Sequence, residues 1–385
     1  MSANSASEPE PAFELAKSEF LAGLARYQVR DFVQAERHYQ ASLRLLPGRP
    51  STLVNLAATQ LLLGQLADAL ASADAALVAE PANTDALLHR GSALARLGRA
   101  SEALAAFERL NTLAPTHPLA WSHRGSLLRE MKRFDEAVLA FREALRHGAD
   151  PALHRYYLAG LGAGDVPPAP PRGYVERLFD AYADDFDQHL LDQLGYRAHT
   201  GLVERVRRCA DPAGFENALD LGCGTGLCGP LLRPLVRQLT GLDLSASMLA
   251  RSRARDVYDR LEHADAVQFL TETAERFDLV VAADVLIYLG DPAPLFAAAQ
   301  RAMQRGLLAF TVEAADTGGD EDDGGPGWRL LPSLRYAHAR SHLLRLAQCH
   351  GFEAVLVEDA PVRNDQRQAV GGLYLVFRRT TTGSA

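Results

Sequence analysis

The sequence predicts a chain of two domains of different class, an all-α repeat array followed by an α/β domain with a mostly parallel sheet. Pro47, Pro81 and Pro115 recur every 34 residues, a period typical of paired-helix repeats. A glycine- and proline-rich stretch, 162–173, then interrupts the pattern. After residue 174 short apolar strands alternate with helical stretches, which is typical of a parallel sheet.

Composition indicates an ordinary globular protein. Of 385 residues, 48% are hydrophobic and 23% charged, enough for more than one buried core. The net charge of -8 disfavours a nucleic-acid partner. We find no apolar run long enough for a membrane span and no secretory signal, and we expect residues 1–15 to be disordered. The four cysteines are scattered, which favours a reduced, cytoplasmic protein.

Three columns of residues share the period of the prolines, two of small residues and one that is mostly aromatic. They are Gly23, Ala57, Gly91 and Gly125; Ala35, Ala69, Ala103 and Ala137; and Tyr39, Ala73, Phe107 and Phe141. Small residues suit positions where two helices cross closely, and large ones fill the space toward the next repeat. Because proline cannot continue a helix, each unit is predicted to be two antiparallel helices closed by a proline.

This pattern resembles the tetratricopeptide repeat (TPR), in four units over residues 16–151. Unit four departs from the family pattern because Ala149 stands where the closing proline is expected. A capping helix over 152–160 completes a predicted domain of residues 16–161, since a solenoid must cover its last apolar face. The match is closest at Trp121, Gly125, Ala137, Phe141 and Ala144.

The resemblance implies a concave surface for a peptide or protein partner, or for self-association into a homo-oligomer. Asn55, Arg90 and Arg124 are the candidate contacts on that surface.

The second half alternates strands and helices. Two strands close together in sequence, 354–357 and 373–377, predict an antiparallel edge to the sheet. With them we expect a seven-stranded, mostly parallel sheet covered by helices on both faces. The other expected strands are 217–221, 239–242, 266–269, 279–282 and 307–312, and the expected helices are 174–195, 229–235, 247–254 and 293–303.

The motif Asp220–Gly226 (DLGCGTG) follows a strand and opens a helix. Glycines in such a turn let the backbone bend tightly and let a ligand approach without meeting a Cβ atom. Asp243 ends the next strand, where its carboxylate can accept both hydroxyls of a ribose. Charge-assisted hydrogen bonds of this kind contribute roughly 1.5–3 kcal/mol each.

Two ligands compete for this turn. Gly224, Gly226 and Gly229 satisfy G-x-G-x-x-G, and Asp243 follows at a spacing that a nicotinamide dinucleotide allows. Asp220 argues against that ligand, since it would repel a pyrophosphate and attract an ammonium or sulfonium. Asp265, placed to accept the amino group of an adenine, and the presence of a single nucleotide-binding unit also argue against a dehydrogenase.

Taken together, the segments resemble the class I S-adenosylmethionine-dependent methyltransferases over residues 172–380. The resemblance implies a Rossmann-like fold for the predicted domain 174–380 and S-adenosylmethionine as its cofactor. The TPR units followed by Gly-Tyr-Val-Glu-Arg-Leu-Phe-Asp, from Gly173, resemble bacterial proteins described as predicted TPR-repeat methyltransferases. The cofactor-binding residues that follow are Asp220, Gly222, Cys223, Gly224, Gly226, Asp243, Leu244, Asp265, Ala266, Asp284 and Tyr182.

Candidate acceptor contacts come from two further segments. In this family the loop Asp284–Tyr288 lies beside the transferred methyl group, so Tyr288 is a candidate to orient the acceptor or to act as a base; packing in the core is the competing interpretation. Arg335, Tyr336 and His338, expected at the start of a helix, are candidate substrate contacts, with His338 also a candidate catalytic residue. His338 and His342 alone make a poor metal site, and we expect no metal.

The leading hypothesis is therefore a methyltransferase that transfers a methyl group to an unidentified small-molecule or protein acceptor and releases S-adenosylhomocysteine. A TPR scaffold whose second domain holds the cofactor without catalysis is the rival from a different class. A nicotinamide-dependent oxidoreductase is the third hypothesis.

Overall fold

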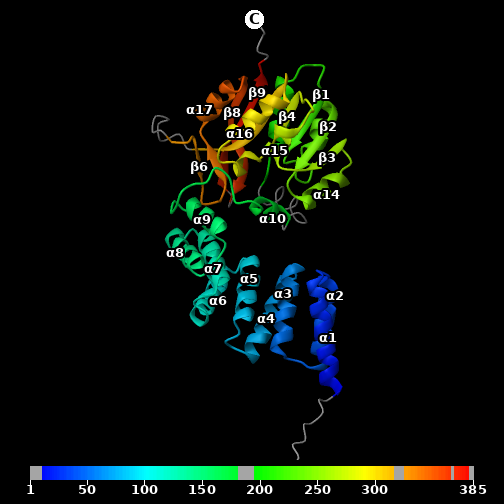
Figure 1. Ribbon diagram of the computed structural model, residues 1–385, viewed down its shortest axis with the longest axis vertical. Coiled ribbons are helices and arrows are strands. Elements are labelled where there is room, and N and C mark those ends of the chain that lie inside the picture. The colour runs from blue at the N-terminus through cyan, green and yellow to red at the C-terminus, as the bar shows by residue number, and fades with distance from the viewer. Residues whose placement is uncertain (1–10, 181–194, 316–324, 366–367, 381–385) are drawn as a thin grey trace, which may run out of the picture. The chain divides into compact units, whose positions relative to one another are not determined.

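A computed structural model describes residues 11–180, 195–315, 325–365 and 368–380 of the chain (Figure 1). The chain divides into two compact units, Met1–His154 and Arg155–Ala385. The division falls inside helix α9 (Pro151–Gly160), the helix expected as the cap of the repeats. The predicted boundaries at 161/162 and 173/174 stay a prediction.

The first unit is built from consecutive helix pairs, as the 34-residue period predicts (Figure 1). Each pair is joined by a short turn, and each second helix is followed by the first helix of the next pair. The helices are α1 (Pro11–Gln28), α2 (Phe32–Leu45), α3 (Pro50–Leu62), α4 (Leu66–Ala79), α5 (Thr84–Arg96), α6 (Ala100–Leu113), α7 (Pro118–Glu130) and α8 (Phe134–Arg146).

The recurring spacing of small and aromatic residues has a direct packing reason within each pair. A Cβ atom on Gly91 would lie 2.5 Å from the ring of Phe107, and one on Gly125 would lie 2.6 Å from the ring of Phe141. In the second pair the chain carries Ala57 and Ala73 instead, both fully buried. An extra methyl on the first helix is thus accommodated where the second helix lacks the aromatic ring.

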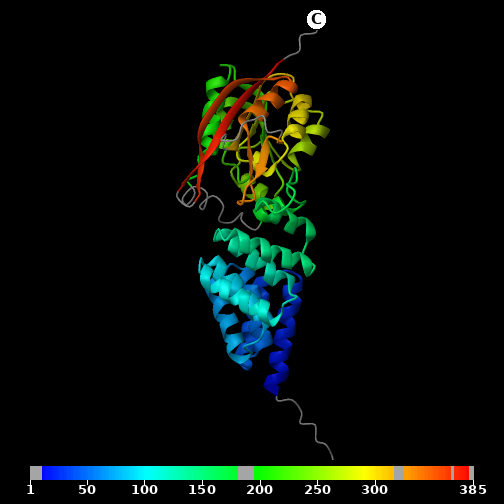
Figure 2. The same ribbon diagram turned by 90° about the vertical axis from the view of Figure 1, so that its left-hand side faces the viewer.

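The second unit is an α/β fold around one sheet. Helices and short 3₁₀ turns connect its strands, and β8 and β9 form the long hairpin visible in Figure 2. The strands are β1 (Phe215–Leu221), β2 (Val236–Asp243), β3 (Arg260–His263), β4 (Leu279–Ala282), β5 (Leu307–Ala314), β6 (Trp328–Leu330), β7 (Tyr336–His338), β8 (Phe352–Asp365) and β9 (Gln368–Arg379). The helices are α10 (Tyr174–Asp180), α12 (Ala198–Cys209), α13 (Gly229–Leu232), η2 (Arg233–Leu235), α14 (Ala246–Ala254), α15 (Ala266–Glu272), η3 (Leu286–Tyr288), α16 (Ala293–Ala302) and α17 (Arg340–Cys349).

Strand order confirms a mostly parallel sheet with an antiparallel edge. Strands β3, β2, β1, β4 and β5 lie side by side and are parallel. Strand β9 pairs antiparallel with β5 and with β8. Leu221 pairs with Leu242, so β1 and β2 end together at one edge of the sheet. The chain order reverses between β1 and β4, and such a switch point is where open α/β sheets bind ligands.

Apolar residues fill both faces of the sheet. One cluster joins the sheet to α15, α16 and α17 and includes Phe277, Phe296 and Phe310, all at most 1% exposed. A second cluster joins the opposite face to α12 and α13 through residues such as Leu202 and Leu232. Burial on both faces explains why the central strands read as continuous apolar runs.

Two expectations about the elements of this unit are wrong. The stretch 266–269 is helix α15 rather than a strand, because the Asp265 side chain accepts a hydrogen bond from the Gln268 backbone N–H at 2.9 Å and caps a helix there. The third strand is β3, just before it. Arg335–His338 does not begin a helix, since Tyr336–His338 is β7 and α17 begins at Arg340.

The hairpin of β6 and β7 was not expected. Strand β7 pairs parallel with the last residues of β5, Glu313 and Ala314, beyond the point where β4 ends. It raises the sheet to nine strands in the described part of the chain, against the seven predicted. Strands of three residues carry too little periodicity to be found from sequence alone.

The helix expected over 174–195 is described only as α10, Tyr174–Asp180. Tyr182 lies outside the described residues. None of the helices within the described ranges is long and apolar enough to cross a membrane.

Candidate functional site

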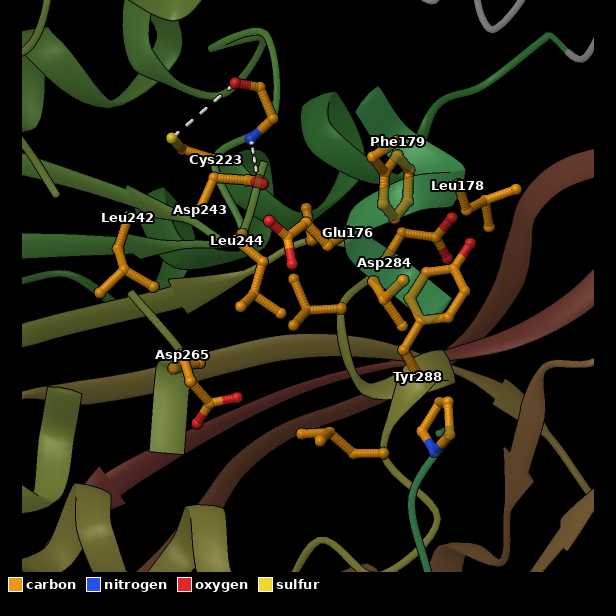
Figure 3. A pocket seen from close by; sticks show the side chains of 18 of the residues that line it. Glu176, Leu178, Phe179, Cys223, Leu242, Asp243, Leu244, Asp265, Asp284 and Tyr288 are labelled. Carbon is orange, nitrogen blue, oxygen red and sulfur yellow. Dashed lines mark hydrogen bonds between the residues drawn. The ribbon is translucent and has the colours of Figure 1, made fainter. Parts of the chain in front are cut away.

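A cavity of about 820 Å³ lies in the second unit, at the edge where β1, β2 and β4 end. Figure 3 shows Leu242, Asp243 and Asp265 toward one side of it, and Phe179 and Tyr288 toward the other. The structure therefore brings together segments that are far apart in the sequence. The predicted cofactor residues that line the cavity are Asp220, Gly222, Cys223, Gly224, Asp243, Leu244, Asp265, Ala266 and Asp284.

The glycine turn after β1 leaves backbone open to the cavity. Gly222 and Gly224 have φ of 59° and 56°, a left-handed conformation that side chains other than glycine rarely adopt. A Cβ atom on Gly222 would also lie 2.6 Å from Val285. The Cys223 backbone N–H donates to the Leu242 carbonyl at 2.9 Å, which ties the turn to the end of β2.

Gly226 is placed differently from the prediction. It is not among the residues that line the cavity. A Cβ atom there would lie 2.8 Å from Ser252 Oγ and 3.1 Å from Tyr258. Its small size thus serves the packing of the turn against α14 and the segment that follows it, rather than contact with a ligand.

Asp243 holds the two loops of the site together. Its Oδ2 accepts from the Gly224 backbone N–H at 2.8 Å, and its Oδ1 accepts from the Ser245 backbone N–H at 2.8 Å. Burial raises the pKa of Asp243, and these hydrogen bonds offset that rise only in part. Because each carboxylate oxygen has two acceptor sites, the Asp243 carboxylate keeps acceptor capacity for a ligand hydroxyl.

Asp220 is the most deeply buried acid of the site, at 1% exposed. Burial raises the pKa of Asp220 to about 7; a hydrogen bond donated by the Tyr258 hydroxyl at 2.6 Å lowers it, and the nearby Asp243 raises it. The carboxyl therefore changes charge near neutral pH. Sequence reasoning missed Tyr258, which lies in an irregular segment with no motif.

Asp265 is exposed and caps α15. The cap uses Oδ1, and none of the described residues donates to Oδ2. Its position at the cavity wall leaves that second oxygen available to a ligand.

The loop after β4 takes part in a buried network of ion pairs. Asp284 has φ of 61°, and its backbone N–H donates to Thr311 Oγ1 at 2.8 Å. Arg363, 2% exposed, donates to the Asp284 carboxylate at 3.1 and 3.3 Å and also to Glu313. Sequence reasoning found Asp284 but missed Glu313 on β5 and Arg363 on β8, because these two strands meet the loop after β4 only through the tertiary fold.

Tyr288 lines the cavity and its ring meets that of Phe179 edge-on, with centroids 5.5 Å apart. Burial raises the pKa of Tyr288; a hydrogen bond with Arg335 lowers it, and the charge of Asp284 raises it. The phenol therefore stays protonated at neutral pH. This favours a role in orienting a ligand over a role as a base.

Tyr336 and His338 are corrections to the predicted site, because neither lines the cavity. Both are fully buried. The Tyr336 hydroxyl donates to the Pro167 carbonyl at 2.8 Å, and His338 Nε2 lies 2.8 Å from the Leu289 carbonyl. Burial lowers the pKa of His338 to about 4. Since side chains alternate along a strand, Arg335 faces the cavity while these two face the interior.

Helix α10 forms one wall of the cavity. Phe179, Leu178 and Glu176 line it, and the Ser245 hydroxyl donates to Asp180 Oδ1 at 2.5 Å. That hydrogen bond lowers the pKa of Asp180. The helix is thereby fixed to the loop that follows β2.

The described residues contain no group of three or more His, Cys, Asp or Glu side chains that could hold a metal ion. Cys223 and Cys228 are buried free thiols, and burial raises the pKa of each.

The polar positions predicted on the repeats form contacts within the first unit. Asn55 donates to the Ser51 carbonyl at 2.8 Å, and Arg90 donates to Asp74 at 2.7 Å. Arg124 lies 3.5 Å from Glu108. The two arginines thus link consecutive helix pairs.

Comparison with known families gives two matches. The model of a methyltransferase domain matches residues 219–306, and the model of the tetratricopeptide repeat matches residues 84–117 and 119–146. These ranges include the glycine turn, Asp243 and the loop after β4 in the first case, and the third and fourth helix pairs in the second.

Two curated relatives illustrate the similarity. A malonyl-[acyl-carrier protein] O-methyltransferase of Enterobacter lignolyticus is 30% identical over 166 residues, 42% of this chain and 57% of that protein. Nodulation protein S of Bradyrhizobium diazoefficiens is 36% identical over 102 residues, 25% of this chain and 46% of that protein. The chain spans about half the length of the curated relatives it matches.

A solved structure, the N-methyltransferase NodS from Bradyrhizobium japonicum WM9 in complex with S-adenosyl-L-homocysteine, is 20% identical. It aligns with a TM-score of 0.42 over 53% of this chain and 97% of that one. The α/β fold of the second unit follows from its strand order and does not depend on this alignment.

Proposed function

Because the chain carries tetratricopeptide repeats and a methyltransferase domain, we propose that it is an S-adenosylmethionine-dependent methyltransferase with an unidentified acceptor. The observation that supports this most is the arrangement at the edge of the sheet. An open glycine turn and three carboxylates, Asp220, Asp243 and Asp265, line one cavity of about 820 Å³. That volume lies in the range of small-molecule and cofactor sites.

The donor set fits the chemistry of this cofactor. Asp243 would accept the ribose hydroxyls with the acceptor sites that Gly224 and Ser245 leave open. Asp265 would accept the adenine amino group through Oδ2. Asp220, when ionised, would attract the ammonium and sulfonium charges, whereas it would repel a pyrophosphate.

Bound there, S-adenosylmethionine would supply an electrophilic methyl group for a nucleophile, with its sulfur as the leaving group that keeps the electron pair of the carbon–sulfur bond. The chain contributes orientation and exclusion of water, which lower the barrier by several kcal/mol in such reactions. Phe179 and Tyr288 supply an apolar edge-to-face wall at the side where the acceptor would stand. The protonated phenol of Tyr288 would donate a hydrogen bond to that acceptor.

The atom that receives the methyl group is not inherited from the relatives. One is named as an O-methyltransferase and another as an N-methyltransferase. A basic side chain is needed only for an acceptor that must lose a proton. The proposal therefore includes no catalytic base.

We propose that the repeats dock a peptide or protein, either the acceptor, a regulator or a second copy of the chain. We also propose a cytoplasmic location, which the free cysteines favour, since disulfides are rare there.

The test is titration of the full-length chain with S-adenosylmethionine, S-adenosylhomocysteine and a nicotinamide dinucleotide, each followed by calorimetry. We expect the first two to bind and the third not to bind. Incubation with labelled S-adenosylmethionine and fractionated cell extract should then label an acceptor. Binding without transfer to any fraction would favour the scaffold, and binding of the dinucleotide alone would favour an oxidoreductase.

A further inference from the structure

The guanidinium of Arg335 is a charged group in the wall of the cavity. It lines the cavity and is half-buried. It forms no ion pair with any of the residues that the structure describes, and its side chain forms a hydrogen bond with Tyr288. Burying an unpaired charge is costly. The charges of Asp284 and Glu313 offset this cost in part, but no carboxylate of the described residues pairs with Arg335 directly, and its place in the cavity wall lets a ligand anion do so.

The neighbouring carboxylates are already occupied. Asp284 and Glu313 both accept hydrogen bonds from Arg363. Burial lowers the pKa of Arg335, but the nearby Tyr288, Asp284 and Glu313 raise it by more. Arg335 therefore remains a cation and keeps its donors for another acceptor. An arginine fork matches the two oxygens of a carboxylate or phosphate in geometry as well as in charge.

The two sides of the cavity differ in chemistry. Asp243 and Asp265 lie toward one side and Tyr288 toward the other (Figure 3). Arg335 hydrogen-bonds with Tyr288, which places it on the second side. Phe179 and Leu289 also line the cavity. Asp284 lies beside Tyr288 on this side and is held by Arg363, and Glu176 and Arg172 also line the cavity. Among the described residues of this side, Arg335 is thus an arginine without a carboxylate partner that lies next to apolar surface.

We propose that the methyl acceptor carries an anionic group, a carboxylate or a phosphate, that docks on the Arg335 guanidinium, while its apolar part packs against Phe179 and Leu289. The inference rests on the proposed function and narrows it from an unidentified acceptor to an anionic one. The anionic group is an anchor, so the proposal does not require that it be the group methylated.

The test uses the full-length chain with S-adenosylhomocysteine present. Alkyl and aryl carboxylates of increasing length, each paired with its primary amide, are titrated by calorimetry, and a matched set of alkyl and aryl phosphates forms a second arm. We expect at least one acid to bind about tenfold or more tightly than its neutral partner. Comparison of the two arms tells a carboxylate from a phosphate.

Arg335→Gln should abolish the preference for the anion, and Arg335→Lys should retain part of it because the charge remains without the fork. Arg345→Gln is the matched control, since Arg345 is an exposed arginine of α17 that does not line the cavity. It should keep the full preference.

The inference is overturned if no acid exceeds its amide in the unaltered chain, or if the preference survives Arg335→Gln. The comparison of acid with amide in the unaltered chain holds even if a variant fails to fold. The S-adenosylhomocysteine titration on the same samples decides the proposed function separately. Cofactor binding without an acid preference would remove only the anionic anchor.

Discussion

Both units of this protein use glycine where a side chain would not fit, but for different physical reasons. In the repeats, Gly91 and Gly125 are helical, and a Cβ atom would collide with the ring of Phe107 or Phe141. In the α/β unit, Gly222 and Gly224 adopt positive φ, and their bare backbone lines a cavity. Packing therefore requires glycine at positions 91 and 125, whereas backbone conformation and ligand access require it at positions 222 and 224.

This difference decides how much of the structure of each unit can be predicted from its sequence. A packing glycine and its aromatic partner lie 16 positions apart in the same helix pair, so the relation repeats and is visible as a period. The glycine turn depends on partners from β2 and the loop after β4. In the repeats, by contrast, a Cβ atom on Gly91 or Gly125 would lie closest to the aromatic ring of its own helix pair. Substitutions in the two units should therefore have different effects.

The largest expected effect is on the site. Asp243→Asn removes the charge and sets an amide donor against one of two backbone N–H groups, those of Gly224 and Ser245. Since hydrogen bonds to charged groups are worth about 1.5–3 kcal/mol each, affinity for S-adenosylmethionine should fall by about 100-fold or more. Calorimetric titration measures the change.

A matched control for that substitution is Asp278→Asn. Asp278 also accepts from two backbone N–H groups, those of Glu216 and Asn217, both at 2.9 Å, but it does not line the cavity. Its replacement should lower stability and leave cofactor affinity unchanged. Equal affinities for the Asp243→Asn variant and the unaltered chain would contradict the proposed role of Asp243.

In the repeats the corresponding destabilising substitution is Gly125→Ala. The new methyl group would lie 2.6 Å from the Phe141 ring, and overpacking of this kind costs about 1–3 kcal/mol of unfolding free energy. Thermal unfolding followed by circular dichroism should show a lower midpoint, with cofactor affinity retained. Adding Phe141→Leu should recover part of the loss, as the alanine pair of the second repeat suggests.

Gly164→Ala is the control for the glycine itself. A Cβ atom there meets nothing closer than 3.9 Å, and its φ is not positive. We expect no loss of stability. If Gly164→Ala and Gly125→Ala behaved alike, packing against the aromatic ring would not be the reason for Gly125.

The smallest effect concerns pH. Asp220 has a pKa of about 7, so it is protonated below and ionised above neutrality. A cationic ligand prefers the ionised form, and affinity for S-adenosylmethionine should therefore rise by about tenfold from pH 6 to pH 8. Asp220→Asn should remove this part of the rise. Tyr258→Phe, which deletes a hydrogen bond that lowers the pKa, should move the rise to higher pH.

The same group sets the sign of a stability change. An unfolded aspartate has a pKa near 3.8, so between that value and about 7 the folded chain binds more protons than the unfolded chain. Unfolding free energy should fall as pH rises through this window. Urea denaturation of the chain and of Asp220→Asn measures it, and identical pH profiles for the two would contradict a raised pKa.

Three of the acids predicted at the site lie close together in the structure. Asp220 and Asp243 lie at the ends of β1 and β2, Asp265 follows β3, and all three line the cavity. The prediction failed for Tyr336 and His338, because the segment was taken as the start of a helix. As a strand it sends alternate side chains to opposite faces, and only Arg335 reaches the cavity.

The sequence by itself determined the helical repeats, the alternation of strands and helices around the parallel core apart from β3, and the glycine turn with its acids, because each follows from contacts or periods that are local along the chain. Only the tertiary structure decided that Arg363 from β8 pairs with Asp284, that Tyr258 donates to Asp220, and that Arg335 contacts Tyr288 in the cavity wall. The reason is burial. A charge changes its pKa and its partner according to what the whole fold packs around it, and no local pattern records that.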